Sequence, residues 1–280
     1  GGCKWQSMSY KAQLEFKHST VVNNLKRIGG IIPEIIHPII PSEKNTFYRN
    51  KLEYTFSNKR WLTQDEIDQP EDFTKQTDGL GFHIPGRFDK ILDIEKCHLQ
   101  ADPSNAIRIE IRNYAIKNGL PFFDIRKQEG LLRNLIIRNT TIAELMVLVS
   151  FYKNDVEAIE NLLNHVKNKF PEITSLMYVV NEKKNDTISD LEIKLYHGKG
   201  HIVEKLDCLQ YQIGPKTFFQ TNSTQAVELY KATLKMAEFK GNETVYDLYS
   251  GSGTIACFVA GSVKKVVGLD GYGIKITKQE

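Results

Sequence analysis

The spacing of apolar side chains along this chain predicts several helices and many short strands. Residues 10–28 and 155–170 carry apolar side chains every three or four positions, which is the period of an amphipathic helix. Residues 49–61 alternate imperfectly between apolar and polar side chains, which predicts a strand. Similar patterns predict helices over residues 104–118, 223–239 and 254–260, and strands within residues 79–93, 131–138, 144–153, 175–180, 192–196, 202–206, 209–213, 245–249 and 265–270.

The order of these elements changes near residue 214. Up to residue 213, strands broken by a few helices predict an α+β middle domain. Residues 214–280 read as helix, strand, glycine turn, short helix and strand, which is the start of an α/β doubly wound, Rossmann-like domain. Such a sheet normally has further strands, so we expect an uncovered apolar face and strand edge, and instability or dimerisation through them if the chain ends at Glu280.

Of the 280 residues, 41% are hydrophobic and 25% are charged. This composition is typical of a folded protein and excludes the disordered, collagen-like and coiled-coil classes. The chain carries 37 basic and 34 acidic residues, a net charge of +3, so a nucleic-acid surface would have to come from local arrangement of charge. The helix predicted over residues 10–28 is amphipathic and has a basic face, which holds Lys11, Lys17, Lys26 and Arg27.

Four widely spaced cysteines are too few for a disulfide scaffold, and no apolar run approaches the roughly 20 residues of a membrane span. A cytoplasmic protein with no membrane partner is therefore expected. Cys208 and Cys257 are interpreted as core residues. Cys3 and Cys97 lie beside charged residues, which suggests iron–sulfur or zinc ligation, although each alone is also typical of a small buried residue and two thiolates cannot fill a four-ligand site.

The strongest local signal is a glycine turn between a strand and a helix, followed by an acid at the end of the next strand. Gly251 and Gly253 would let a cofactor approach the backbone, and Asp270 could accept hydrogen bonds from both hydroxyls of a ribose. The spacing permits a dinucleotide or S-adenosylmethionine. Asp247, just before the turn, favours the cationic methyl donor, because an acid would repel a pyrophosphate.

Basic and aromatic residues are interleaved in two stretches. Arg49 and Lys51 would share one face of a strand, suited to phosphates, beside aromatics that could stack on unpaired bases. His83 and Arg87 lie in a second mixed stretch. From composition alone, an ordinary half-buried strand with solvated charges is the better explanation of the first stretch, and the second stretch has the same ambiguity.

Six pieces of the chain, in order, resemble the RNA uridine-C5 methyltransferases, specifically the 23S ribosomal RNA (uracil-5-)-methyltransferase branch that carries an iron–sulfur cluster. The matching pieces are Gly1-Gly2-Cys3-Lys4-Trp5-Gln6, Arg49-Asn50-Lys51-Leu52-Glu53, Gly81-Phe82-His83 with Gly86-Arg87-Phe88, Cys97-His98-Leu99-Gln100, Phe218-Phe219-Gln220-Thr221-Asn222 and Asp247-Leu248-Tyr249-Ser250-Gly251-Ser252-Gly253-Thr254.

The resemblance implies that residues 214–280 begin an S-adenosylmethionine-binding methyltransferase domain. It implies cofactor contacts from Gln220, Tyr249, Thr254 and Asp270, in addition to the residues of the glycine turn. Ribosomal RNA is the implied partner, with transfer RNA as an alternative within the broader family, and the complete protein is expected to be a monomer.

The resemblance also implies that Cys3 and Cys97 are two of the four thiolates of a [4Fe-4S] cluster. The other two cysteines of the family precede the matching Gly-Gly pair, so we expect residues 1–213 to hold a remnant of the cluster motif, with the cluster absent or incomplete.

The implied chemistry is methyl transfer to carbon-5 of a uridine. The family adds a cysteine thiolate to carbon-6, which makes carbon-5 nucleophilic, and a carboxylate later removes the carbon-5 proton. In the family both groups lie downstream of the last strand recognised here, so no catalytic residue is assigned to this chain. Two alternatives stay open: a non-catalytic RNA- or cofactor-binding fragment, and an unrelated nucleotide-dependent oxidoreductase, which only the glycine pattern permits.

Overall fold

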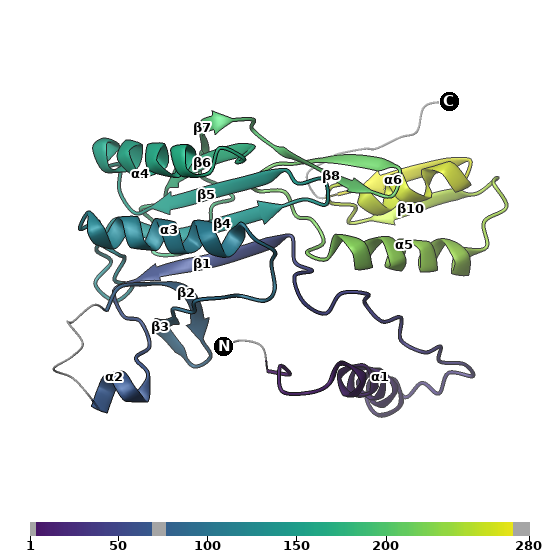
Figure 1. Cartoon of the computed structure of the whole chain (residues 1–280). Helices are drawn as coiled ribbons and strands as arrows, with labels where there is room; N and C mark the ends of the chain where they lie inside the picture. Colours follow the sequence, from purple (N-terminus) through teal and green to yellow (C-terminus); the bar gives the residue numbers. More distant parts are fainter. Residues whose placement is uncertain (1–3, 69–76, 271–280) are drawn as a thin grey trace.

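The computed structural model describes residues 4–68 and 77–270 and is built around a mixed seven-stranded sheet (Figure 1). The strands lie in the order β3-β2-β1-β4-β5-β6-β7, and every neighbouring pair is antiparallel except β5 and β6. Their bounds are Lys51–Ser57 (β1), Gly79–Ile84 (β2), Arg87–Leu92 (β3), Leu132–Asn139 (β4), Leu145–Phe151 (β5), Ser175–Val180 (β6) and Lys194–Gly198 (β7).

Strands β4 and β5 are buried on both faces of the sheet, which explains why their sequences are nearly continuous apolar runs. In β5, Val147 and Val149 enter one hydrophobic cluster while Met146 and Leu148 enter another on the opposite face. Helices α3 (Ser104–Lys117) and α4 (Val156–Lys169) pack on the first face, where Figure 1 shows them along the sheet.

The second face of the sheet is covered by elements from both predicted domains. The hairpin of β8 (Ile202–Leu206) and β9 (Leu209–Ile213) packs there together with Phe219 and helix α5 (Ser223–Ala237). A single cluster thus spans position 213, so the two predicted units share a hydrophobic contact.

The last described elements form a parallel pair, β10 (Thr244–Leu248) and β11 (Lys265–Leu269), connected by α6 (Thr254–Val259) and a short 3-10 helix (Ala260–Ser262). Alternation along the strands buries Val266 against α6 and leaves Tyr246 and Leu248 each 62% exposed. Within the described residues, the expected uncovered apolar face is therefore present.

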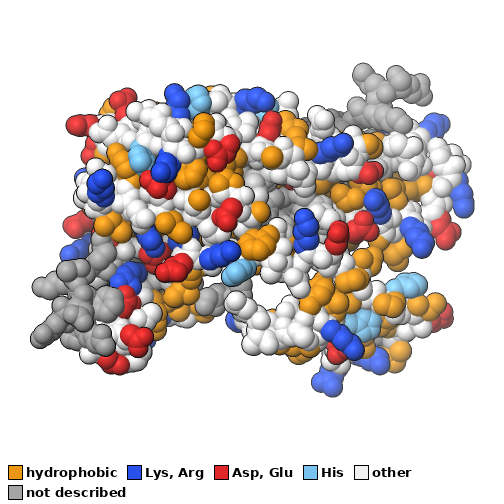
Figure 2. All heavy atoms as spheres, in the orientation of Figure 1, with side chains coloured by type: hydrophobic (Ala, Val, Ile, Leu, Met, Phe, Trp, Pro, Cys, Tyr) orange, Lys and Arg blue, Asp and Glu red, His pale blue; other side chains and the backbone are white. Residues whose placement is uncertain are grey.

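Helix α1 (Tyr10–Arg27) begins at the cap Ser9 and has no buried residue, and Figure 1 shows it apart from the sheet. The segment after it exposes several isoleucines, and hydrophobic side chains gather over this region in Figure 2. It is tied to the body where Gln225 of α5 donates to the Ile40 carbonyl. Helix α2 (Gln64–Asp68) is one short turn, and no helix of the described residues is long and apolar enough to cross a membrane.

The helices and strands expected from the sequence are confirmed to within a few residues; β7 begins two residues later than predicted. The interpretation of Cys208 as a core residue is wrong. It is exposed in the turn between β8 and β9, which Asp207 makes with a positive φ of 56°. Cys257 is half-buried and packs against the second cluster, as expected.

The exposure of Cys208 leads to a simple labelling prediction. In the folded protein Cys208 should react with Ellman's reagent within minutes, whereas Cys97, which is 5% exposed, should react only on unfolding. The control Cys208→Ser should lower the number of rapidly reacting thiols by one. An unchanged number would contradict the turn geometry.

Candidate functional site

Both predicted acids of the glycine turn are hydrogen-bonded to its backbone. The Gly251 N–H donates to Asp270 Oδ2 at 2.8 Å, and the Ala256 N–H donates to Asp247 Oδ2 at 3.0 Å. The Ser250 N–H donates to the Leu269 carbonyl at 3.0 Å, which extends the β10–β11 pairing past Leu248. The turn is thus held against the carboxyl ends of two parallel strands, where ligands bind in open α/β sheets.

The backbone of the turn leaves room for a cofactor. Tyr249, Gly251 and Gly253 have φ values of 63°, 53° and 70°, and a Cβ built on Gly251 would meet nothing within 4 Å. Tyr249 is 91% exposed. Its left-handed backbone conformation is strained for a residue other than glycine, and such strain is concentrated at functional sites. The buried Ser250 hydroxyl has no hydrogen-bond partner among the described residues. These features fit S-adenosylmethionine.

Asp270 and Tyr249 line a hollow of about 210 Å³ with Leu248 and Leu269. Because an ionised carboxylate can accept about four hydrogen bonds, the contact with Gly251 is compatible with a ribose bound at Asp270. The apolar neighbours Leu248 and Leu269 would suit an adenine ring.

Thr254 is tied to the protein interior. Its hydroxyl lies 3.3 Å from the Tyr230 hydroxyl of α5, and its carbonyl accepts from the Tyr211 hydroxyl of β9 at 3.3 Å. Burial raises the pKa of Tyr211 well above its usual range, so this hydroxyl stays a donor. In this arrangement Thr254 fixes the start of α6.

Gln220 lies near the turn but in a different hollow. Its loop contacts the turn where the Ser252 hydroxyl donates to the Phe218 carbonyl at 3.4 Å. The Asn50 amide donates to the Gln220 carbonyl at 2.8 Å and so fixes the loop from the other side. Gln220 itself lines a hollow of about 440 Å³ with Ile40 and one face of α5, and the structure does not bring it together with Asp270 in one cavity.

A larger groove of about 880 Å³ lies between two surfaces. One is formed by the start of β1 and the end of β4, and the other by the loop that precedes α5. Arg49 and Lys51 both line it, so the structure brings together these two predicted RNA-binding residues. Its other cationic and aromatic residues are Arg138, Lys216, Phe82, Phe218 and Phe219. Elsewhere, Figure 2 shows basic and acidic side chains interspersed over the surface in view.

The basic residues of the groove are close enough to perturb one another. Burial lowers the pKa of Lys51, and the nearby Arg138 and Arg49 lower it further, while Glu53 opposes them. Burial also lowers the pKa of Arg138 to about 10. At a pKa of about 10, Arg138 remains charged at neutral pH. Lys51 forms an ion pair with Glu53 at 3.8 Å.

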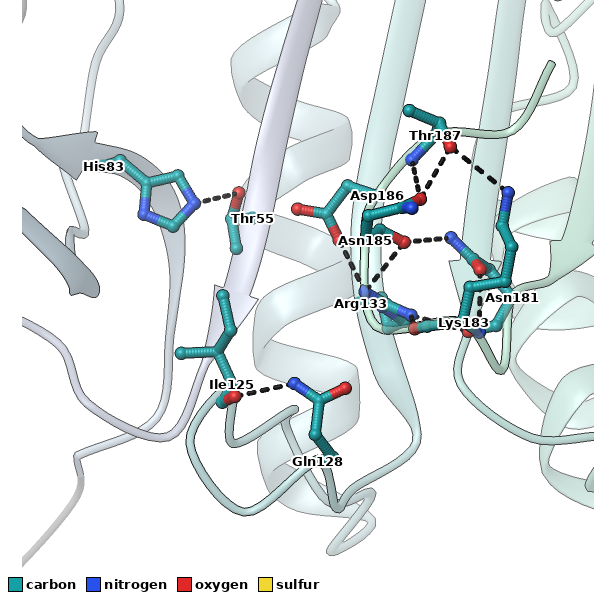
Figure 3. Close-up of polar contacts among 10 residues, drawn as sticks. All are labelled: Thr55, His83, Ile125, Gln128, Arg133, Asn181, Lys183, Asn185, Asp186 and Thr187. Atoms are coloured by element: carbon teal, nitrogen blue, oxygen red, sulfur yellow. Dashed lines mark hydrogen bonds and ion pairs between the residues drawn. The ribbon is translucent and has the colours of Figure 1, made fainter.

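His83 and Arg87, the other two predicted RNA-binding residues, do not line this groove. His83 of β2 lies 3.2 Å from the Thr55 hydroxyl through Nε2, as Figure 3 shows, and Arg87 is exposed at the start of β3. One wall of the groove is formed by residues 186–189, and Arg133 holds this loop through Asp186 and three backbone carbonyls.

Sequence reasoning missed Arg138, which pairs with Lys51 across β1 and β4. These two residues are far apart in the chain, and the only signal that could have joined them was the pairing of strands that are not consecutive. Lys216, two residues before the quoted Phe-Phe-Gln motif, was also missed.

Cys97 lies in the main hydrophobic core, and its backbone N–H donates to the Asn105 side chain at 2.7 Å. Cys3 lies outside the described residues. Among the described residues, no group of three or more His, Cys, Asp or Glu could hold a metal ion. The described part of the chain does not by itself form a cluster site.

Comparison with known proteins finds relatives that are named RNA methyltransferases. No family model matches the sequence. The chain is 52% identical to an uncharacterized RNA methyltransferase of Porphyromonas gingivalis, over 96% of this chain and 59% of the relative. It is 36% identical to one of Chlorobaculum tepidum, over 96% of this chain and 56% of the relative.

A solved structure matches with a TM-score of 0.71 and 29% identity, over 96% of this chain and 58% of the other. It is the Pyrococcus abyssi tRNA (uracil-54, C5)-methyltransferase in complex with S-adenosyl-L-homocysteine. The chain therefore spans less than two thirds of the length of these relatives. Over nearly its whole length, it is similar in sequence to proteins named RNA methyltransferases and in structure to a methyltransferase that acts on uracil carbon-5.

Proposed function

We propose that this chain belongs to an RNA (uracil-C5) methyltransferase that uses S-adenosylmethionine. The observation that carries the proposal is the glycine turn, whose Gly251 N–H is bound to Asp270 at the end of the neighbouring parallel strand. The similarity to RNA methyltransferases, and to a uracil-C5 enzyme in complex with S-adenosyl-L-homocysteine, supports the proposed function.

In this proposal the cofactor binds the turn, with its ribose on Asp270, and the RNA binds the groove of Arg49 and Lys51. The proposed substrate is a uridine of 23S ribosomal RNA, as the sequence resemblance implies. Transfer RNA is the second candidate, because the structural neighbour is a transfer-RNA enzyme.

None of the described cysteines suits the attacking thiolate of the proposed reaction. Cys97 is buried in the core and Cys208 is exposed on a hairpin turn. Burial, followed by the nearby Asp247, raises the pKa of Cys257, which disfavours the thiolate. We therefore place the nucleophile and the base outside the described residues.

The reaction displaces the proton at carbon-5, which gives a specific test. The full-length protein, incubated with S-adenosylmethionine and RNA containing [5-³H]uridine, should release one tritium to water for each methyl group transferred. Separate transcripts of 23S ribosomal RNA and transfer RNA identify the substrate. Methyl transfer without tritium release would move the reaction to another atom, and absence of any methyl transfer would overturn the proposal.

A further inference from the structure

Arg138 differs from the other buried arginines in having no carboxylate at ion-pair distance among the described residues, although Glu53 lies close enough to raise its pKa. Arg108 forms an ion pair with Asp93 at 3.3 Å, and Arg133 forms one with Asp186 at 2.7 Å. Arg138 is only 6% exposed, yet no ion pair joins it to an acid within the part of the chain that the structure describes. Glu53 also contacts Lys51 at 3.8 Å, so it compensates the charge of this buried guanidinium only in part, and an anion from outside the chain would stabilise it.

The contacts of Arg138 leave part of its hydrogen-bonding capacity unused. Its Nη2 donates to the carbonyls of Thr217 at 2.7 Å and Pro215 at 3.4 Å. Its Nε is buried without a hydrogen-bond partner in the described structure. A guanidinium has five N–H donors in a planar fork that suits the oxygens of a phosphate.

The surroundings of Arg138 strengthen the case for an anion. Lys51 faces it across β1 and β4, and Arg49 and Lys216 line the same groove. The acids in the groove are Glu53, which contacts Lys51, and Asp186, which is engaged by Arg133. The groove therefore has an excess of positive charge around a buried cation.

The aromatic lining points to a nucleotide rather than a simple anion. Phe218 is 73% exposed on the loop whose Thr217 carbonyl Arg138 holds. Aromatic side chains beside a cationic groove are the usual means of binding single-stranded nucleic acid, because bases stack on them. The next carbonyl of this loop, that of Phe218, contacts Ser252 of the glycine turn, so a nucleotide bound here would lie next to the proposed cofactor site.

We propose that this groove binds single-stranded RNA, with one backbone phosphate on Arg138 and Lys51 and a neighbouring base stacked on Phe218. The inference rests on the proposed function for the identity of the ligand. It adds a phosphate subsite centred on Arg138, a residue of the sheet rather than of the cofactor-binding turn.

The salt dependence of RNA binding tests the phosphate contact. Binding of a fluorescent ten-residue oligouridylate to the full-length protein is measured by anisotropy between 50 and 200 mM salt. Each phosphate contact with single-stranded RNA contributes about 0.7 to the slope of log K against log salt. Arg138→Gln should lower the slope by about 0.7 and the affinity about tenfold. Arg138→Lys should keep most of the slope, since it keeps the charge.

Three controls keep the result interpretable. Lys169→Gln, which removes an exposed lysine of α4, should leave the slope unchanged. Phe218→Ala should weaken binding without changing the slope, because stacking involves no counter-ion. An oligouridylate with one neutral methylphosphonate linkage at its centre should bind the wild type more weakly but bind Arg138→Gln no worse than the unmodified oligonucleotide does.

Three outcomes would overturn the inference. The first is an unchanged slope for Arg138→Gln, and the second is an equal effect of the neutral linkage on both proteins. The third is equally tight binding of a ten-residue polyglutamate, which would identify a general acidic-polymer site. Failure of the proposed function would instead be absence of methyl transfer, which the tritium-release assay measures separately.

Discussion

Asp270→Ala should weaken binding of S-adenosylhomocysteine by about 10- to 100-fold. Hydrogen bonds to a charged acceptor contribute about 1.5–3 kcal/mol each, and the substitution removes the acceptor proposed for the ribose hydroxyls. The fold should persist, because the Gly251 N–H that loses its partner is exposed and can bond to water. Isothermal titration calorimetry with the purified chain measures the affinity directly.

Two variants bracket this result. Asp270→Asn keeps one acceptor oxygen and should lose only part of the affinity. Asp65→Ala, which removes an exposed carboxylate from α2, should leave the affinity unchanged. If Asp270→Ala bound the ligand within a factor of two of the wild type, the proposed ribose contact would be wrong, whereas methyl transfer by the protein could still be tested independently.

Most local elements of this fold could be predicted because their signals are local. Helix α4 shows the point: Asp155 caps it through the Ala158 N–H, and apolar residues recur along one side until Lys169. The glycine turn could be predicted for the same reason, since its left-handed positions and its following helix are encoded within eight residues.

The parts that could not be predicted depend on which strands become neighbours. The sequence gives no pairing of β1 with β4, so neither the Lys51–Arg138 pair nor the groove above it could be foreseen. Cys97 follows a charged run, yet the chain turns inward there and its side chain enters the main core. Gln220 lines a hollow with Ile40 and α5 rather than the hollow of Asp270, and the Asn50 amide that holds its carbonyl is remote in sequence, so this placement could not be predicted either.

Glu204 is a buried carboxylate that connects the hairpin to the proposed functional loop. It is fully buried in β8, and among the described residues its partners are hydrogen-bond donors rather than cations. Oε1 accepts from the Thr141 N–H at 2.9 Å and from the Thr141 hydroxyl, and Oε2 accepts from the Ser223 hydroxyl at 2.6 Å. Ser223 in turn accepts from Asn50, whose amide also holds the Gln220 carbonyl.

Glu204→Ala should lower the free energy of unfolding by about 3 kcal/mol or more. It leaves the buried Ser223 hydroxyl and the part-buried Thr141 N–H without their acceptor, at about 1–3 kcal/mol for a buried unsatisfied group, and it removes packing at a fully buried position. Urea unfolding followed by circular dichroism measures the change. Glu204→Gln keeps one acceptor oxygen and should lose about half as much, while the exposed Glu182→Ala should change stability by less than about 0.5 kcal/mol.

The hydrogen bond between Ser223 and Glu204 leads to a further prediction for Ser223→Ala, alone and combined with Glu204→Ala. Ser223→Ala removes the link between Glu204 and Asn50 but leaves the Thr141 contacts intact, so it should cost less stability than Glu204→Ala. Because the two residues share one hydrogen bond, the double variant should be less destabilised than the sum of the single variants. Additive effects, or a Glu204→Ala protein within about 1 kcal/mol of the wild type, would mean that this carboxylate does not organise the loop that carries Gln220.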